Sequence, residues 1–219
     1  MALVKIENIK KTFSGIEVLK GISFSLDAGK QYVIRGPSGS GKSTLFYLLG
    51  GLDRPTSGNI FIDGLNLYAM NDDELANFRN QFVGFVFQFH FLLSSMNCLD
   101  NILLPAKIGN HNILEVEKFA LSNAQILGVE HCLKKFPYEL SGGEQQRINV
   151  IRALSLRPKL ILCDEPTGSL DSKNSQIVVG LLKEMAAKYA STLVVVTHDD
   201  YIASQFQNHF ALNDGQLMK

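Results

Sequence analysis

The chain has 219 residues, of which 46% are hydrophobic and 19% are charged, and its 21 Lys and Arg residues balance its 21 Asp and Glu residues. This composition is typical of a globular protein, and a chain of this length buries roughly 70% of its unfolded surface on folding. The balanced charge excludes the highly charged disordered class and gives no basic field, so we expect no nucleic-acid partner.

Cysteine usage and the N-terminal sequence bear on the compartment. Cys98, Cys132 and Cys163 form no C-x-x-C pair, so we expect reduced thiols in the core of a cytosolic protein. Lys5 and Glu7 stand where a signal peptide needs an apolar run, and no stretch reaches about 18 uninterrupted apolar residues. We therefore expect a protein that is neither exported nor membrane-spanning.

Alternation of apolar and polar side chains predicts half-buried strands at 3–9, 21–26, 59–64 and 209–217. Strands of this kind have one face on the core and the other toward water, which is common in antiparallel sheets. We therefore expect these four segments to form an antiparallel flank.

Strands that are covered on both faces are predicted at 31–35, 159–164 and 192–198, because these runs are short, apolar and rich in β-branched residues. Helical patterns follow at 41–52 and 172–189. In the second pattern the residues expected on one apolar face are Ile177, Val178, Leu181, Leu182 and Met185. Alternating strands and helices predict an α/β fold with a parallel central sheet.

The region from about 90 to 157 has mostly helical spacing, with Pro105, Pro137 and Pro158 as expected breaks. We interpret it as an α-helical subdomain inserted in the catalytic core. The sequence has no repeat or long linker, so we expect residues 1–219 to form a single domain.

The sequence GPSGSGKST at 36–44 matches the phosphate-binding loop G-x-x-x-x-G-K-[ST], directly after a predicted strand and at the start of a predicted helix. In such a loop the backbone N–H groups face the phosphates, Lys42 reaches the β- and γ-phosphates, and Ser43 offers its hydroxyl to Mg²⁺. We therefore predict a nucleotide site here. Its members are Gly36, Pro37, Ser38, Gly39, Ser40, Gly41, Lys42, Ser43 and Thr44.

Polar side chains also stand at the ends of two other central strands. Asp164 ends the run LILCD, where a carboxylate can hold the hydration shell of magnesium. Glu165 follows and can polarise an attacking water as a general base, whereas His198 can hydrogen-bond the γ-phosphate. Two other interpretations stay open at this point, an acidic pair that caps the sheet edge and a structural histidine.

The stretch LSGGEQQR at 140–147 precedes a helical pattern, with Ser141 as the predicted N-cap and Glu144 in capping-box position. Capping does not require Gly142 and Gly143, each of which costs a first helical turn about 1 kcal/mol relative to alanine. A helix N-terminus with a free serine hydroxyl is a second anion site. Since the chain has one complete phosphate loop, we expect this second site to meet the γ-phosphate held by another copy.

These motifs, in this order along nearly the whole chain, resemble the ATPase subunits of ABC transporters. The ordered set is the phosphate loop, Gln88 in GFVFQF, LSGGEQQR, LILCDEP, GSLD at 168–171, and His198. The resemblance implies a P-loop NTPase (RecA-like) core that binds ATP and Mg²⁺. It also implies a homodimer in which each ATP lies between the phosphate loop of one subunit and the LSGG sequence of the other.

Individual roles follow from the resemblance. It implies that Ser141, Gly142 and Gly143 act in trans and that Asp171 lines the dimer seam. It implies that the ring of Phe13 stacks on adenine. The implied magnesium ligands, some through water, are Ser43, Gln88 and Asp164; the implied catalytic residues are Lys42, Glu165 and His198.

A narrower resemblance, over 48–58, 78–93 and 100–109, is to the Lol-type lipoprotein-releasing ATPases. It implies a peripheral subunit on the cytoplasmic face of the inner membrane that powers an integral membrane partner. The apolar segment Gln88–Met96 is the expected docking region for a short helix of that partner. An ATPase of macrolide or peptide export or of cell division is the alternative, with a soluble non-transport ABC ATPase as a further one. Asn149 departs from the family pattern, and we expect it to be buried with a hydrogen-bond partner.

Overall fold

The computed structural model describes residues 1–89, 91–168 and 172–218, with the side chains of the third stretch described from 175 onward. The strands are β1 (Ala2–Phe13), β2 (Ile16–Asp27), β3 (Gln31–Arg35), β4 (Ser57–Ile62), β5 (Leu65–Asn66), β6 (Val83–Phe87), β7 (Leu160–Asp164), β8 (Thr192–Thr197), β9 (Asn208–Asn213) and β10 (Gln216–Met218). The α-helices are α1 (Lys42–Leu49), α2 (Asp72–Phe82), α3 (Cys98–Ile108), α4 (Ile113–Ile126), α5 (Gly142–Leu154), α6 (Ser172–Lys188) and α7 (Asp200–Ser204). Single 3₁₀ turns are η1 (Leu67–Ala69), η2 (Glu130–Cys132) and η3 (Pro137–Glu139).

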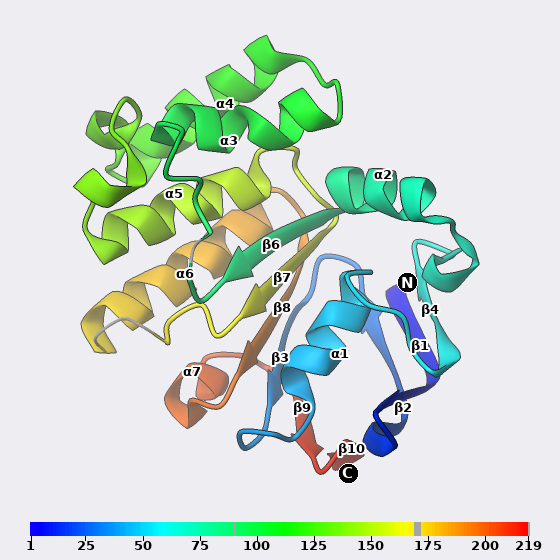
Figure 1. Cartoon of the computed structure of the whole chain (residues 1–219). Coiled ribbons are helices and arrows are strands. Elements are labelled where there is room, and N and C mark those ends of the chain that lie inside the picture. The colour runs from blue at the N-terminus through cyan, green and yellow to red at the C-terminus, as the bar shows by residue number, and fades with distance from the viewer. Residues whose placement is uncertain (90, 169–171, 219) are drawn as a thin grey trace.

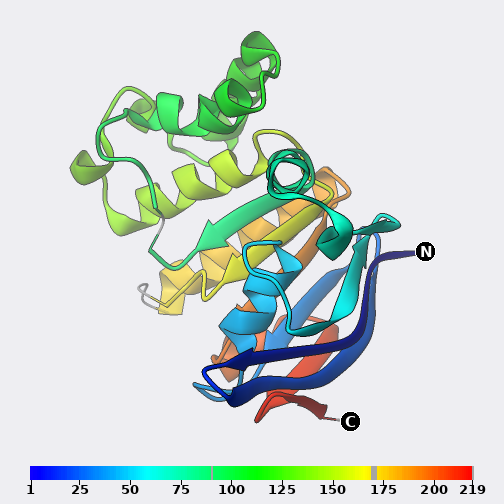
Figure 2. The same cartoon turned by 45° about the vertical axis from the view of Figure 1, so that its right-hand side comes forward.

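Two sheets organise the fold (Figure 1). One has the strand order β2-β1-β4-β5 and is antiparallel; the other has the order β10-β9-β3-β8-β7-β6, in which β3, β6, β7, β8 and β9 run parallel. One apolar cluster joins both sheets through α1, and its fully buried members include Ile6, Phe46 and Val194. Figure 2 shows α1 between the two sheets. The α/β fold with a parallel central sheet is therefore confirmed.

The prediction for 209–217 is partly wrong. These residues form β9 and β10 of the six-stranded sheet, where β9 pairs parallel with β3 and only β10 pairs antiparallel. The alternation is real, because β9 lies near the edge of its sheet and Leu212 is buried while His209 is exposed. Alternation reports on burial of one face, and it does not specify the direction of the neighbouring strand.

The other face of the six-stranded sheet is covered by α5 and α6, and α3 and α4 pack beyond its edge strand β6 (Figure 1). Pro105 was expected to break a helix, but α3 continues through it. The proline removes one helical hydrogen bond. The loss is offset by packing, because Ile102, Leu103 and Ala106 of the same helix are buried. On α6 the predicted apolar face is correct except for Ile177, which is 43% exposed.

Parallel register brings the predicted site residues to one edge of the sheet. Phe87 of β6 pairs with Asp164 of β7, which pairs with Val196 of β8. The phosphate loop follows β3 on the other side of β8, so four strands end beside one another. Across the described ranges, no helix combines the length and apolar composition that crossing a bilayer requires.

Candidate nucleotide-binding and catalytic site

The phosphate loop connects β3 to α1 and is closely packed at both ends. A Cβ atom on Gly36 would collide with the Leu212 carbonyl oxygen, and Gly41 has a φ of 100° that a larger residue rarely adopts. The Nζ atom of Lys42 donates hydrogen bonds to the carbonyls of Gly36 at 2.8 Å and Pro37 at 3.0 Å. The loop borders a cavity of about 230 Å³.

Two observations fit this loop to a phosphate group. The hydroxyl of Ser40 is buried and has no hydrogen-bond partner among the described residues. A buried hydroxyl of this kind is costly unless a ligand satisfies it. The side chain of Lys42 is almost fully buried, and its ammonium group is held by the loop's own carbonyls. The loop therefore offers one cation and one unpaired hydroxyl to an anion.

Asp164 lies next to the loop at the end of β7, where the Ser43 hydroxyl hydrogen-bonds its carboxyl group. Burial raises the pKa of Asp164, and the charge of Glu165 raises it further. The Oδ1 atom of Asp164 is buried without a hydrogen-bond partner in the described parts of the chain. An unsatisfied carboxylate oxygen beside a serine hydroxyl fits Mg²⁺, which prefers hard oxygen ligands.

Glu165 and His198 lie in contact, which was not predicted from the sequence. The Oε1 atom of Glu165 accepts hydrogen bonds from the backbone N–H of His198 at 3.0 Å and from its Nδ1 at 2.7 Å. Glu165 has a φ of 46°, in the left-handed region that residues other than glycine seldom adopt, directly after β7 ends. The Oε2 atom accepts a hydrogen bond from the Thr197 hydroxyl at 3.0 Å. Three donors therefore fix this carboxylate.

Sequence reasoning did not select Thr197. The available signal was its position, as a polar residue at the end of the apolar run VVV. Thr197 is fully buried in the structure. Gln146 was missed as well. It is fully buried one turn after the LSGG sequence (140–143, the signature), and its Nε2 donates to the Pro166 carbonyl at 2.9 Å. Both residues hold the segment that carries Asp164 and Glu165.

The remaining predicted residues lie at different distances from this centre. The side chain of Gln88 packs on Gly168, since a Cβ atom on that glycine would lie 2.6 Å from Gln88 Nε2. Phe13 is 48% exposed at the end of β1, and the Nζ atom of Lys11 lies 4.7 Å from its ring centroid. Asp171 falls outside the described residues.

The predicted capping box at the start of α5 is present. Ser141 is the N-cap, and its hydroxyl accepts from the backbone N–H of Glu144. The prediction of a free serine hydroxyl is wrong, because this hydroxyl donates to Glu144 Oε2 at 2.6 Å. The Glu144 carboxylate carries a full negative charge, so it accepts a stronger hydrogen bond from the Ser141 hydroxyl than a water molecule would.

The LSGG sequence is nevertheless open on its outer side. Ser141 and Gly142 are exposed, and a Cβ atom on Gly142 would meet no atom within 4 Å. Figures 1 and 2 place α5 and α1 in separate parts of the molecule. Asn149, further along α5, is fully buried and its Oδ1 accepts from Arg152, as expected, while its Nδ2 has no partner among the described residues.

The family model described as ABC transporter matches residues 19–168, which include the loop, the signature and the Asp164–Glu165 pair. The chain belongs to the ABC transporter family of ATPases. Among the relatives of this ABC ATPase, the lipoprotein-releasing system ATP-binding protein LolD of Cytophaga hutchinsonii is 42% identical over 216 residues, covering 99% of both chains. The LolD protein of Bacteroides fragilis is 40% identical, covering 99% of this chain and all of that protein.

Solved structures agree with this assignment. A dimeric bacterial ABC transporter cassette is 37% identical to this ABC ATPase, with a TM-score of 0.90 and coverage of 99% of this chain and 97% of that chain. A post-hydrolysis state of that cassette, bound to ADP and Pi, has a TM-score of 0.89. The fold is therefore that of an ATP-hydrolysing cassette.

Proposed function

We propose that this ABC ATPase powers the release of lipoproteins from the inner membrane, as a homodimer bound to an integral membrane partner on the cytoplasmic face. The substrate class comes from the relatives named for lipoprotein release at about 40% identity over the whole chain. The dimer is supported by one observation on this chain: the exposed Ser141 and Gly142 of the LSGG sequence lie apart from the phosphate loop and the Asp164–Glu165 pair.

Within one reaction centre, each residue has a distinct task. Lys42 exchanges its bonds to the loop carbonyls for bonds to the phosphates of ATP. Glu165 takes a proton from the attacking water, and Thr197 and His198 keep its carboxylate in place. A magnesium ion held by Ser43, Gln88 and Asp164 would neutralise charge on the phosphates.

The second half of each centre comes from the partner subunit. Ser141, Gly142 and Gly143 stand at the N-terminus of α5, where backbone N–H groups and the helix dipole favour an anion. The Ser141 hydroxyl now donates to Glu144 and would turn to the γ-phosphate on dimer closure. Asp171 would line the seam and Phe13 would stack on adenine.

Complementation between two inactive variants tests this arrangement. Lys42→Ala removes the cation of the phosphate loop. Gly142→Asp disables the LSGG sequence, because it places a negative charge where the γ-phosphate bound by the partner subunit would lie. Gly142→Asp should not harm folding, because Gly142 has open space around it, and an acidic residue is favourable in a first helical turn.

Each variant alone should be inactive. An equal mixture should regain about a quarter of the parental turnover, since half of the dimers are mixed and each mixed dimer has one intact site of two. A mixture that stays as inactive as its components would contradict the trans arrangement, provided that cross-linking detects mixed dimers.

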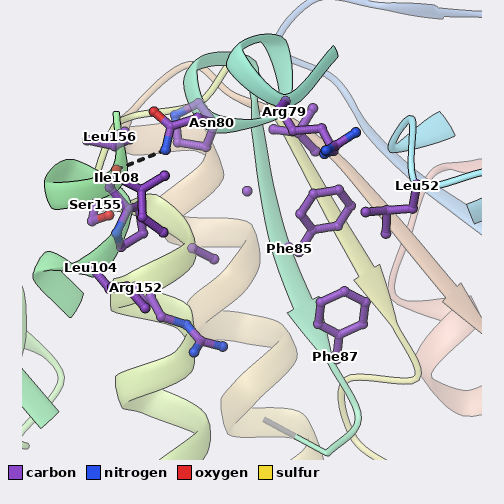
Figure 3. Close-up of a pocket in the computed structure, with 16 residues that line it drawn as sticks. Leu52, Arg79, Asn80, Phe85, Phe87, Leu104, Ile108, Arg152, Ser155 and Leu156 are labelled. Atoms are coloured by element: carbon purple, nitrogen blue, oxygen red, sulfur yellow. Dashed lines mark hydrogen bonds between the residues drawn. The ribbon is translucent and has the colours of Figure 1, made fainter. Parts of the chain in front are cut away.

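The membrane partner is proposed to dock on the apolar surface around Gln88–Met96. A cavity of about 420 Å³, lined by Phe87 directly before this segment, lies between β6 on one side and α3 and α5 on the other. Figure 3 shows Phe85 and Phe87 on the strand facing Leu104 and Ile108 on the helix. Next to it, the Phe91 ring is 61% exposed and lies 5.2 Å from the Phe87 ring, centroid to centroid.

A short apolar helix of the membrane subunit suits this surface, because Ile108, which lines the cavity, is more than half exposed, as are Phe89 and Phe91 just after its lining residue Phe87. Phe91→Ala should therefore weaken association with the membrane subunit by about tenfold or more. It should leave the ATPase activity of the isolated chain intact. Leu114→Ala, at a 69% exposed residue of α4, is the matched control.

The substrate proposal needs its own assay. The chain would be reconstituted with its membrane partner in liposomes that carry a lipoprotein, and ATP-dependent release would be measured. Loss of release with Glu165→Gln supports the proposal. Release of no lipoprotein, together with ATP-dependent transport of a macrolide or peptide, would contradict it in favour of the export alternative.

A further inference from the structure

A second set of metal-ligating side chains lies beside the signature. His131 and Cys132 belong to η2, and Glu144 belongs to the first turn of α5. The Nε2 atom of His131 lies 2.9 Å from Glu144 Oε1, and the Sγ atom of Cys132 lies 3.4 Å from both of these atoms. One nitrogen, one sulfur and one oxygen atom therefore face a common point.

These separations fit a tetrahedral zinc ion. Zinc takes ligands at about 2.0–2.1 Å for nitrogen, about 2.3 Å for thiolate sulfur and about 2.0–2.2 Å for carboxylate oxygen, so neighbouring ligand atoms lie about 3.3–3.7 Å apart. The ligand atoms therefore need to move by only a few tenths of an ångström. The His131 side chain is 58% exposed and is free to adjust.

The donor set selects among cations. A thiolate and an imidazole favour Zn²⁺ and similar transition metals, whereas Mg²⁺ and Ca²⁺ prefer oxygen ligands only. The set is thus chemically different from the Ser43, Gln88 and Asp164 oxygens proposed for magnesium. The exposed side of His131 leaves room for a water molecule as the fourth ligand.

We propose that His131, Cys132 and Glu144 form a zinc-binding site next to the LSGG sequence. On binding, the Cys132 thiol loses its proton to solvent, and the thiolate, the imidazole and the carboxylate each donate one electron pair to the ion. The thiol hydrogen bond to Glu144 is given up in exchange.

Glu144 connects this site to the signature. Its Oε1 faces His131 and Cys132, while its Oε2 accepts hydrogen bonds from the Ser141 N–H at 2.8 Å and from the Ser141 hydroxyl at 2.6 Å. An ion on Oε1 holds Glu144 in the conformation that retains the Ser141 hydroxyl. Zinc should therefore slow ATP turnover. This consequence rests on the proposed function, whereas the ion site itself does not.

Cobalt(II) is the spectroscopic probe for the site. Titration of the metal-free protein with Co²⁺ should give thiolate-to-cobalt charge-transfer absorption and the strong visible bands of tetrahedral coordination, both lost on addition of Zn²⁺. His131→Ala should weaken binding by at least about tenfold. Cys132→Ser should abolish the charge-transfer absorption. The matched controls, His111→Ala and Cys98→Ser, should behave as the parent.

His131→Ala is the decisive variant, because an exposed histidine can be removed without opening the core. Unchanged cobalt spectra in both His131→Ala and Cys132→Ser would overturn the site. Zinc should slow turnover of the parent and spare His131→Ala; equal slowing of both would overturn the coupling to Ser141. The cobalt spectrum should form in Lys42→Ala without ATP, so failure of the metal site and failure of the proposed function are distinguishable.

Discussion

Replacement of Glu165 by glutamine tests the proposed chemistry directly. The Glu165 carboxylate accepts hydrogen bonds from the His198 backbone, His198 Nδ1 and the Thr197 hydroxyl. Glutamine keeps one oxygen of the same shape for His198, and its amide nitrogen can donate to the Thr197 hydroxyl, which can accept. We therefore expect the fold and the position of the side chain to be retained.

The effect should fall on the rate of hydrolysis. A positioned general base contributes about 10²–10⁴ in rate, which corresponds to about 3–5 kcal/mol in the activation free energy. Nucleotide affinity should not fall, because the charge of Glu165 raises the pKa of Asp164. Removing that charge lowers the pKa of Asp164 and favours its ionised form, which is the form that holds magnesium.

Two measurements separate these effects. Phosphate release measures turnover, and sedimentation with Mg-ATP measures the dimer, which should become long-lived when ATP is bound but not hydrolysed. Glu184→Gln, an exposed change of the same kind on α6, is the control. Turnover of Glu165→Gln at the parental rate would refute the base assignment, whatever the state of the dimer.

Three further predictions follow from single sites. Lys42→Ala removes charge-assisted hydrogen bonds worth about 1.5–3 kcal/mol, so calorimetry should show ATP binding about 10–100-fold weaker, and unchanged affinity would contradict the site. Phe46→Ala opens the core at a fully buried ring and should cost about 3–5 kcal/mol in the free energy of unfolding by denaturant, whereas a loss under about 1 kcal/mol would contradict that packing. Hydrogen bonds from the Ser141 hydroxyl and backbone and from His131 lower the pKa of Glu144 from 4.5 to about 2. The stability that Glu144 contributes is therefore present above pH 4.5 and lost as the pH falls toward 2, so Glu144→Gln should flatten the unfolding free energy across that window, and identical pH profiles would contradict it.

The sequence predicts those parts of the site that depend on local geometry. Glycines at fixed spacing between an apolar strand and a helix specify the phosphate loop, because few other turns require glycine at these positions. Asp164, Glu165 and His198 were predicted from their positions at strand ends, and parallel pairing brings such ends together. The Ser141 capping box was predicted because it spans only four residues.

Features that depend on distant partners could not be predicted. The direction of β9 is decided by β3, far away in the sequence, and α3 continues through Pro105 because of the residues that pack around it. The donor role of the Ser141 hydroxyl toward Glu144 is a local contact and was missed for a different reason, since a capping box predicts this hydroxyl only as an acceptor. Cys132 and its neighbour His131 meet Glu144 only because η2 lies against the start of α5.

One helix contacts the three segments that the proposed function requires. At its start α5 carries the signature, one turn later Gln146 donates to the Pro166 carbonyl behind Glu165, and near its end Arg152 donates to the Phe91 carbonyl at 2.7 Å. Burial lowers the pKa of Arg152 to about 10, so its charge persists at neutral pH. A continuous hydrogen-bonded helix moves as a nearly rigid unit, whereas a loop can change its conformation locally. If a membrane subunit docks on Phe91 as proposed, a movement of Phe91 would shift Ser141 and the Pro166 carbonyl together and would couple docking to both halves of the reaction centre.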